Sequence, residues 1–63
     1  MDYFKELIDW SLTEKRGLTI FLDGQTVAGI VVRVIGTAAI EVRSQTYSRL
    51  IIRLDAIIAL GAA

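Results

Sequence analysis

The stretch LTIFLDGQTVAGIVVRVI, at residues 18–35, decides the fold. In its first five residues, large aliphatic side chains recur at every second position, which predicts a half-buried strand. Asp23-Gly24 then gives a strong signal for a tight hairpin turn. From Thr26 to Ile35 a β-branched run predicts a long second strand, in which Gly29 marks a bend or a bulge.

Further strands are predicted downstream. Ala38–Arg43 and Tyr47–Leu54 alternate in the same way and are joined by a short turn at Ser44–Thr46. Asp55 breaks the pattern, and Ala56–Leu60 predicts a last strand that is apolar on both faces. The final Gly-Ala-Ala is expected to fray. The last two strands have few of the residues that prevent exposed strand edges from pairing with other chains, and the final strand has neither Lys nor Pro.

The residues before residue 18 predict a helix from Asp2 to Arg16. Its apolar residues fall at helical spacing and form one stripe, which consists of Phe4, Leu7, Ile8 and Leu12. Asp2 is the expected N-cap, and Gly17 is the expected C′ residue in the left-handed conformation. Lys15 and Arg16 would then lie in the last turn, where cations interact favourably with the helix dipole.

Residues 1–63 are therefore predicted to form one mainly-β domain, with a helix at about 2–16 and five strands within about 18–60. Short, strongly bent antiparallel strands predict a small barrel of the SH3-like kind, with the helix over one open end. A domain of this size buries only about 60% of the surface of its unfolded chain. Yet 54% of the residues are apolar, and the chain has no Cys or His for a disulfide or a structural zinc site. Self-association is the remaining source of stability.

The same composition argues against several classes of protein. Without an imidazole or a thiol, and without an enclosed pair of carboxylates, the chain is not expected to be an enzyme or to use a cofactor or metal. The longest uncharged stretches, Gly24–Val32 and Ala56–Ala63, are far shorter than the roughly 20 apolar residues that span a membrane. The charged N-terminal residues argue against a secretory signal. We therefore expect a cytoplasmic, non-enzymatic module.

Two segments resemble the signatures of the Sm-like superfamily, including its bacterial Hfq branch. The first, LDGQTVAGIV at residues 22–31, is similar to the family's strand, turn, glycine and long bent strand, in that order. The second, IRLDAIIAL at residues 52–60, is similar to the family pattern Ile-Arg-Gly-x-x-Ile-x-x-Ile on the last two strands. With the helix and the strand count, the resemblance covers nearly the whole chain. It implies the Sm-like fold, a helix followed by a strongly bent five-stranded antiparallel barrel.

The resemblance also implies a homo-oligomeric ring, a hexamer or a heptamer, with six subunits favoured in the Hfq branch. In such rings the fourth strand of one subunit pairs with the fifth strand of the next. The apolar edges of this chain give a separate reason, because a closed head-to-tail ring leaves no edge exposed. The expected interface residues are Leu50, Ile51, Ile52, Leu54, Ile57, Ile58 and Leu60.

In the Sm family, a base of single-stranded RNA is held at the pore by an Asp, an Asn and the Arg of the second signature. Arg53 matches the arginine, but Ile35 and Ala39 stand where the Asp and the Asn are expected and cannot hydrogen-bond a base. Where the Hfq pore carries Lys-His, this chain has Leu54-Asp55, and an acidic residue near a pore repels phosphate. Pairing of Arg53 with Asp55 or with an adjacent subunit is an equally good interpretation.

Two further surfaces are candidates. One face of Hfq stacks purines on an aromatic residue of the first strand, a position that Phe21 matches, with Gln25 and Thr26 as hydrogen-bonding groups. The rim of Hfq carries an arginine-rich patch at the end of the helix, where this chain has Lys15 and Arg16. The alternatives are that Phe21 packs against a neighbouring subunit or the helix, and that the two cations only favour the helix dipole.

Two functions are therefore considered. The first is an Hfq-like ring, an RNA chaperone or post-transcriptional regulator, that binds single-stranded RNA by repeated stacking and by Arg and Lys contacts to phosphate. The formal net charge of zero gives no global electrostatic sign of nucleic-acid binding. The second is a ring that has lost the RNA pocket and acts as a protein-interaction scaffold. No membrane partner is expected.

Overall fold

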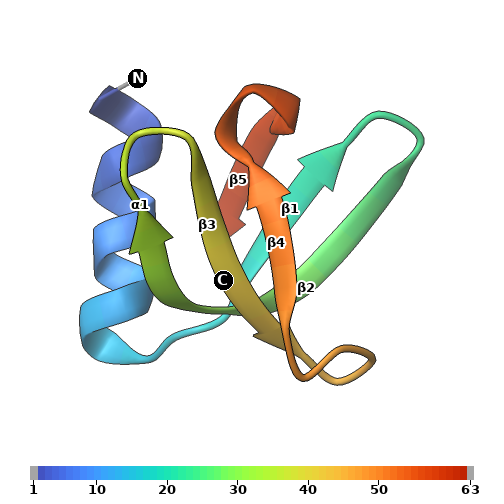
Figure 1. The fold of residues 1–63 in the computed structure, drawn as a ribbon, viewed down its shortest axis with the longest axis horizontal. Helices are drawn as coiled ribbons and strands as arrows, with labels where there is room; N and C mark the ends of the chain where they lie inside the picture. The colour runs from blue at the N-terminus through green and yellow to red at the C-terminus, as the bar shows by residue number, and fades with distance from the viewer. Residues whose placement is uncertain (1, 63) are drawn as a thin grey trace.

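The computed structural model describes residues 2–62, with side chains from Phe4 onward. A single helix precedes five strands in this part of the chain (Figure 1). In chain order the elements are α1 (Asp2–Glu14), β1 (Leu18–Leu22), β2 (Gln25–Ile35), β3 (Ala39–Ser44), β4 (Leu50–Arg53), the 3-10 helix η1 (Leu54–Ala56) and β5 (Ala59–Ala62).

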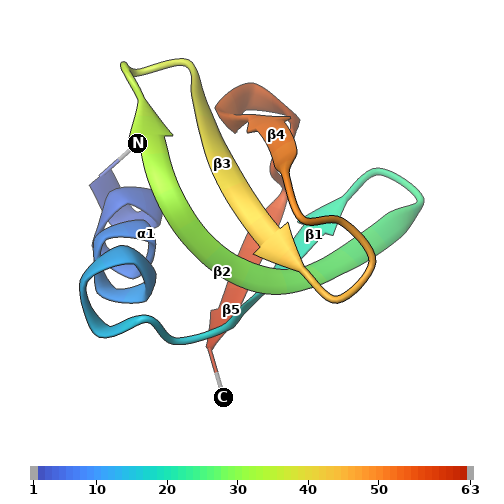
Figure 2. The same cartoon turned by 60° about the horizontal axis from the view of Figure 1, so that its bottom comes forward.

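The five strands form one antiparallel sheet in the order β4-β3-β2-β1-β5. The predicted helix and five antiparallel strands are confirmed, but the strands do not close into a barrel. Within residues 2–62, β4 and β5 are the outer edges of an open, strongly curved sheet (Figure 1). Its curvature is carried by β2, which sweeps through a long arc and pairs with β1 at one end and β3 at the other (Figure 2).

Gly29 lies where β2 pairs with strands on both sides, with Leu18 of β1 and Ser44 of β3. A Cβ at this position would lie 2.6 Å from Val42 Cγ1 and 2.7 Å from the Arg43 carbonyl oxygen. Only glycine allows such a close approach of the bent strand to its neighbour. The register shift itself lies farther along β2, between Val31 and Arg33, so Gly29 permits the bend and the bulge follows it.

The end of α1 differs from the sequence prediction. The helix ends at Glu14 and not at Arg16, and Lys15, with φ of 56°, takes the left-handed C′ position expected for Gly17. The Arg16 N–H donates to the Ser11 carbonyl at 3.3 Å, which is the six-to-one hydrogen bond of a Schellman motif. The Ser11 hydroxyl also donates to the Arg16 carbonyl at 2.6 Å. These bonds reverse the chain before Gly17 is reached.

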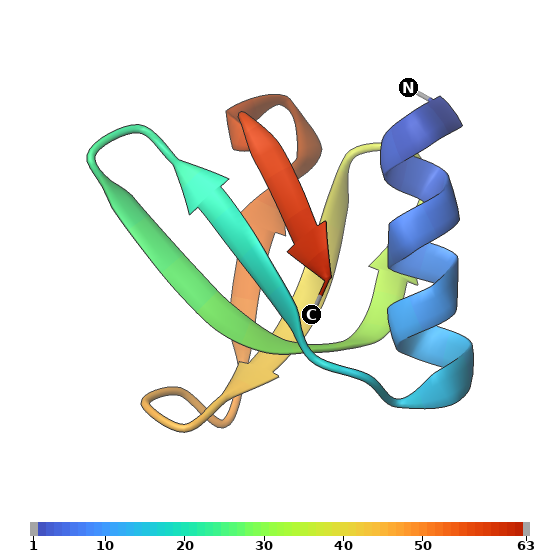
Figure 3. The same ribbon diagram turned by 180° about the vertical axis from the view of Figure 1, so that it is seen from behind.

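Ser11 also joins the helix to the sheet. Its side chain is fully buried, and its Oγ accepts a hydrogen bond from the Val31 N–H at 3.0 Å. Pairing between β1 and β2 ends at Leu18 and Gly29, so α1 replaces β1 as the neighbour of β2 beyond that point. Figure 3 shows α1 standing beside this end of the sheet. We call the junction of Ser11, Arg16 and Val31 the helix seam.

The second half of the sequence departs most from prediction. The fourth strand is shorter than 47–54, because Ser44 and Tyr47 close a turn in which the Ser44 N–H donates to the Tyr47 carbonyl at 2.9 Å and the Tyr47 N–H donates to Ser44 Oγ at 3.0 Å. The expected strand at 56–60 begins as η1, and pairing resumes only at Ala59. The C-terminal residues do not fray before Ala62, which pairs with Leu18.

The core lies between the curved sheet and α1. It contains eight buried aliphatic residues, which are Ile8, Leu18, Ile20, Val31, Ile40, Val42, Ile52 and Ile57. Three residues of the predicted helical stripe, Phe4, Leu7 and Leu12, pack against this core, and so does the neighbouring Trp10. Across residues 2–62, no helix has the length and apolar character needed to cross a membrane.

Candidate functional site

The first candidate surface is the pair of open sheet edges. Both β4 and β5 are four residues long, and each has a strand neighbour on one side only within the described chain. Ile51 of β4 is 49% exposed, and Ile58, just before β5, is 65% exposed. A groove of about 700 Å³ lies between β4 and the β1–β2 hairpin and is lined by Leu22, Val27 and Ile58 among others. We call β4, β5 and this groove the strand edges.

The structure narrows the predicted interface to fewer side chains. Ile52 and Ile57 lie in the core of the chain itself, so their side chains are not available to a second subunit. Three others, Leu50, Leu54 and Leu60, are partly buried against that core. Of the seven predicted interface residues, only Ile51 and Ile58 have exposed side chains. A partner strand would therefore contact the backbone of the strand edges and these two isoleucines.

Of the three residues predicted to contact RNA near the first strand, two share a face. Phe21 is 41% exposed and lies on the face of β1 opposite Ile20, and Thr26 is its cross-strand partner on β2. Gln25 instead pairs with Leu22 and lines the groove at the strand edges. Phe21 therefore does not pack against the helix within this chain, and its ring is accessible for stacking.

The three predicted basic contacts lie on other elements. Arg53, at the end of β4, forms a 2.8 Å ion pair with Asp55, as the alternative interpretation expected. Arg16 lies 5.3 Å from the ring centroid of Trp10, a cation–π contact, and Lys15 adjoins it in the left-handed conformation. Within residues 4–62, no hydrogen bond or ion pair joins the side chain of Arg53 to those of Lys15, Arg16 or Phe21.

The register nevertheless brings together the three positions, 35, 39 and 53, that the resemblance aligns with the pore pocket of Sm proteins. Ile35 of β2 pairs with Ala39 of β3, and Ala39 pairs with Arg53 of β4, so the three lie side by side across the sheet. Ala39 is buried and Ile35 is partly buried, whereas Arg53 is exposed. The position has an apolar floor and a single guanidinium that is already paired with Asp55. None of these three side chains offers a neutral hydrogen-bonding group for a base.

A network on the outward face of the sheet was not predicted from the sequence. Glu41 of β3 accepts hydrogen bonds at Oε1 from Arg33 Nε at 3.1 Å and at Oε2 from Arg49 Nε at 3.0 Å. Partial burial acts to raise the pKa of the Glu41 carboxyl, but the hydrogen bonds and charges of Arg49 and Arg33 outweigh it and hold this pKa below its ordinary value. The sequence signal was the alternation of Glu41 with Arg43, but its partners lie on two other segments.

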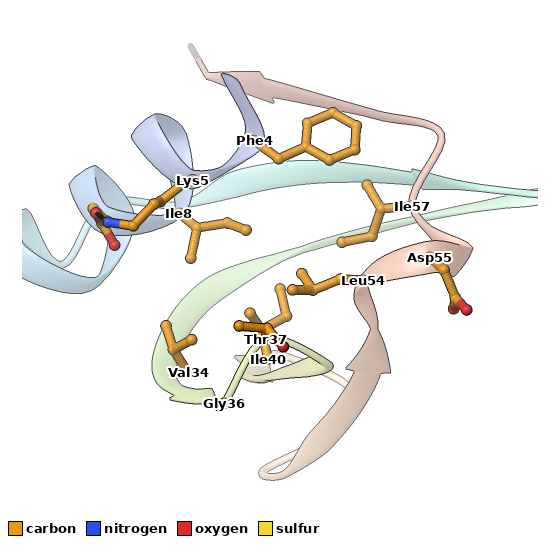
Figure 4. Close-up of a pocket in the computed structure, with 11 residues that line it drawn as sticks. Phe4, Lys5, Ile8, Val34, Gly36, Thr37, Ile40, Leu54, Asp55 and Ile57 are labelled. Carbon is orange, nitrogen blue, oxygen red and sulfur yellow. Dashed lines mark hydrogen bonds and ion pairs between the residues drawn. The ribbon is translucent and has the colours of Figure 1, made fainter. Parts of the chain in front are cut away.

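A pocket of about 630 Å³ lies between α1, the β2–β3 turn and η1 (Figure 4). Its interior is formed by aliphatic and aromatic side chains, including Phe4, Ile8 and Leu54, which point into the space between helix and sheet. At one rim Lys5 forms a 2.7 Å ion pair with Asp9. The pocket has the shape and polarity to take an apolar side chain and lacks the polar interior that a nucleobase requires.

No group of three or more acidic residues that would suit a metal ion lies among the residues that the structure describes. Comparisons of the chain with protein-family profiles, with curated proteins and with solved structures find no match, so its function is inferred from the residues and geometry described above.

Proposed function

We propose that this chain is an Sm-like subunit of a homo-oligomeric ring that binds single-stranded RNA. The observation that carries the proposal is the strand order β4-β3-β2-β1-β5 behind an N-terminal helix, which leaves β4 and β5 as the two free edges. Pairing β4 of one copy with β5 of the next would satisfy both edges, complete the curved sheet as a barrel wall and cover Ile51 and Ile58. A closed ring of six or seven copies leaves no edge exposed.

Stacking on Phe21 is the proposed contact with RNA bases. An exposed aromatic ring on a rigid strand contributes roughly 1–3 kcal/mol per stacked base. Thr26 is the cross-strand partner of Phe21, and its hydroxyl would hydrogen-bond a stacked base. A ring presents one copy of Phe21 per subunit, so several weak contacts act on one strand at high effective concentration. Lys15, Arg16 and Arg53 would add contacts to phosphate.

A protein-interaction scaffold is the second candidate function. It is favoured by the apolar residues Ile35 and Ala39 at the pore positions and by the ion pair between Arg53 and Asp55. The apolar pocket beside α1 supports it as well, because a hydrophobic anchor residue of a protein partner would fit there.

Light scattering and RNA titration test the proposal together. We expect the wild-type protein to have a mass of six or seven subunits and to bind labelled oligo(A) or oligo(U) in fluorescence anisotropy at a stated salt concentration. Phe21→Ala removes the ring from every subunit, so it should weaken binding by at least roughly 5- to 150-fold, which corresponds to the 1–3 kcal/mol of a single stacked base. Thr46→Ala, which truncates an exposed side chain in the β3–β4 connection outside the groove, is the control and should leave affinity unchanged.

The outcomes separate the two functions. An intact ring that binds neither oligonucleotide would exclude the RNA function and leave the scaffold. A folded monomer at micromolar concentration would exclude the ring and both functions that depend on it.

A further inference from the structure

Two arginines contact Glu41 on the outward face of β2 and β3, and a third, Arg43, lies on the same face. The register pairs Arg33 of β2 with Glu41, and Arg43 lies two residues farther along β3, so strand alternation places it on the same face. Arg49, directly before β4, reaches Glu41 from the other side. This cluster contains three guanidinium groups and one carboxylate, and its local charge is positive although the chain as a whole is neutral.

Glu41 holds two of these guanidinium groups in place. Its side chain is only 13% exposed, and each of its carboxylate oxygens accepts from a different arginine. Arg33 donates to Oε1 through Nε at 3.1 Å and forms an ion pair in which its Nη2 lies 3.1 Å from the same oxygen, whereas Arg49 donates to Oε2 through Nε at 3.0 Å. A long arginine side chain loses rotamer freedom when it is fixed, and here part of that loss has already occurred before any ligand binds.

Much of the donor capacity of the cluster remains available. The side chains of Arg33 and Arg49 are more than half exposed. Arg49 is hydrogen-bonded through Nε, which leaves its two terminal nitrogens for a ligand. Arg43 is exposed, and no ion pair or hydrogen bond of its side chain is recorded within residues 4–62. The cluster therefore has more guanidinium N–H donors than the Glu41 carboxylate can accept from, and two of its three guanidinium groups are already held in place.

We infer that this face binds the phosphodiester backbone of single-stranded RNA through Arg33, Arg43 and Arg49, with Glu41 as the positioning residue. The inference rests on the proposed function, since it assigns the backbone contact of the same RNA. It is a site separate from Phe21, which lies near the opposite end of β2 across from Thr26.

A repeating anion fits this face better than a single carboxylate does. Arg33 and Arg43 occupy diagonal positions on neighbouring strands, roughly 7–8 Å apart at the backbone. Guanidinium groups bind phosphate in a two-pronged geometry that suits successive phosphates of one strand. The cross-strand neighbours on this face, Ile30 and Ile51, are aliphatic and offer no ring for base stacking. Binding here should therefore be indifferent to base identity.

Fluorescence anisotropy with labelled oligo(U), repeated over a series of salt concentrations, tests the inference. For a single strand, each lost phosphate contact lowers the slope of log K against log salt by about 0.7, which weakens binding about fivefold near 0.1 M salt. We expect this change for each subunit that the RNA contacts in Arg43→Gln, and twice that slope change in the double variant Arg33→Gln/Arg49→Gln. Lys5→Gln removes one positive charge from α1 and is the matched control, with wild-type affinity and slope.

Glu41→Gln tests the positioning role. This variant removes a negative charge from the face, so electrostatics alone would strengthen RNA binding. If Glu41 positions the arginines, affinity and salt slope should both fall. A purely structural role would lower the melting temperature and leave the salt slope of the folded protein unchanged. A gain in affinity for Glu41→Gln would overturn the positioning role.

Each outcome of the titration separates this inference from the proposed function. Absence of RNA binding by the wild-type ring would remove the proposed function and the inference together. Wild-type binding that Arg43→Gln and the double variant leave unaltered would overturn the inference alone. Poly-glutamate that displaces RNA as well as unlabelled oligo(U) does, at equal charge concentration, would also overturn it, because the face would then recognise acidic protein. Arg43→Gln breaks no ion pair, so it remains informative if the double variant does not fold.

Discussion

At both the helix seam and the strand edges, a strand has no neighbouring strand on one side. The two places differ in whether another element of the chain covers the unpaired strand. At the helix seam, β1 stops pairing with β2, and α1 takes its place with Ser11 as acceptor for the Val31 N–H. At the strand edges, no element of the described chain covers β4 or β5, and Ile51 and Ile58 are exposed. The chain itself supplies a hydrogen-bond acceptor for the backbone at the helix seam but not at the strand edges. We propose that a second copy of the chain pairs with the strand edges.

Among substitutions at the helix seam and the strand edges, Gly29→Val should have the largest effect on stability. It should disrupt the bend of β2, beside which the helix seam forms. The added side chain would meet Val42 and the backbone oxygen of Arg43 at distances below 3 Å, and the backbone of a paired strand cannot yield cheaply. We expect the free energy of unfolding to fall by about 3 kcal/mol or more. Urea denaturation followed by circular dichroism measures it.

Gly17→Ala is the control for this substitution. A Cβ at Gly17 would lie 3.9 Å from the Gly29 carbonyl oxygen, an ordinary contact. Its stability should stay within about 0.5 kcal/mol of wild type. If Gly29→Val were equally harmless, the close approach of β2 to β3 would not be what fixes the bend.

Ser11→Ala comes next, since it breaks the helix seam without changing any backbone. The substitution leaves the Val31 N–H without its acceptor in a buried position and removes the donor to the Arg16 carbonyl. We expect a loss of about 2 kcal/mol, within the range for an unsatisfied buried group. Thermal and urea unfolding should show it, and hydrogen exchange should show faster exchange of the Val31 amide.

Thr13→Ala, at an exposed position two residues along the same helix, is the matched control and should change stability by less than about 0.5 kcal/mol. Equal stability of the Ser11 and Thr13 variants would show that the helix seam is held by apolar packing alone.

The seam and the edges also differ in how far the sequence predicts them. The Asp23-Gly24 hairpin, the bend at Gly29 and the apolar stripe of α1 follow from rules that act over a few residues, and all three are confirmed. Ser11 carries a local signal that is easy to pass over. It stands three residues after Ile8, where a helical stripe calls for an apolar residue, and a polar side chain there implies a buried partner.

The strand edges are harder because their structure depends on distant contacts. Every residue of Ala56–Leu60 is apolar, so no local pattern shows that the strand in this stretch begins only at Ala59. The pairing of β5 with β1, in which Phe21 faces Ala59, and the burial of Ile57 decide where the strand begins. The arginine cluster requires in addition the register shift in β2, which brings Arg33 opposite Glu41 and which periodicity alone does not reveal.

Lys15→Gly should raise the stability of the protein, whereas the two preceding variants lower it. The residue that ends α1 at the helix seam is a lysine, which is not the most stable choice there. A lysine in the left-handed conformation pays a steric penalty that glycine avoids. We expect this variant to stabilise the protein by about 0.5–1 kcal/mol. Glu6→Gly, at an exposed position inside α1, should instead destabilise it by about 1 kcal/mol. If both Lys15→Gly and Glu6→Gly stabilised the protein, the effect would come from the unfolded state and not from the C′ position.

Ile58→Lys should have the smallest effect on the fold and acts only at the strand edges. The side chain is mostly exposed, and the hydrogen bond that holds this residue runs from its backbone N–H to the Phe21 carbonyl at 2.8 Å, so a lysine leaves it intact. We expect the stability of the isolated chain to change by less than about 0.5 kcal/mol. A charge on the pairing edge should nevertheless prevent strand pairing between copies, and light scattering should report a monomer.

A concentration series separates the two effects of Ile58→Lys. If a second copy covers the strand edges, the melting temperature of the wild-type protein rises with protein concentration, because association stabilises the folded state by mass action. The melting temperature of Ile58→Lys should not rise, and the two proteins should converge on dilution. Gln45→Lys adds the same charge in the exposed β3–β4 connection and should behave as wild type. An Ile58→Lys protein with the wild-type mass and concentration dependence would show that the assembly does not use this edge, and the contrast with the helix seam would then have no bearing on assembly.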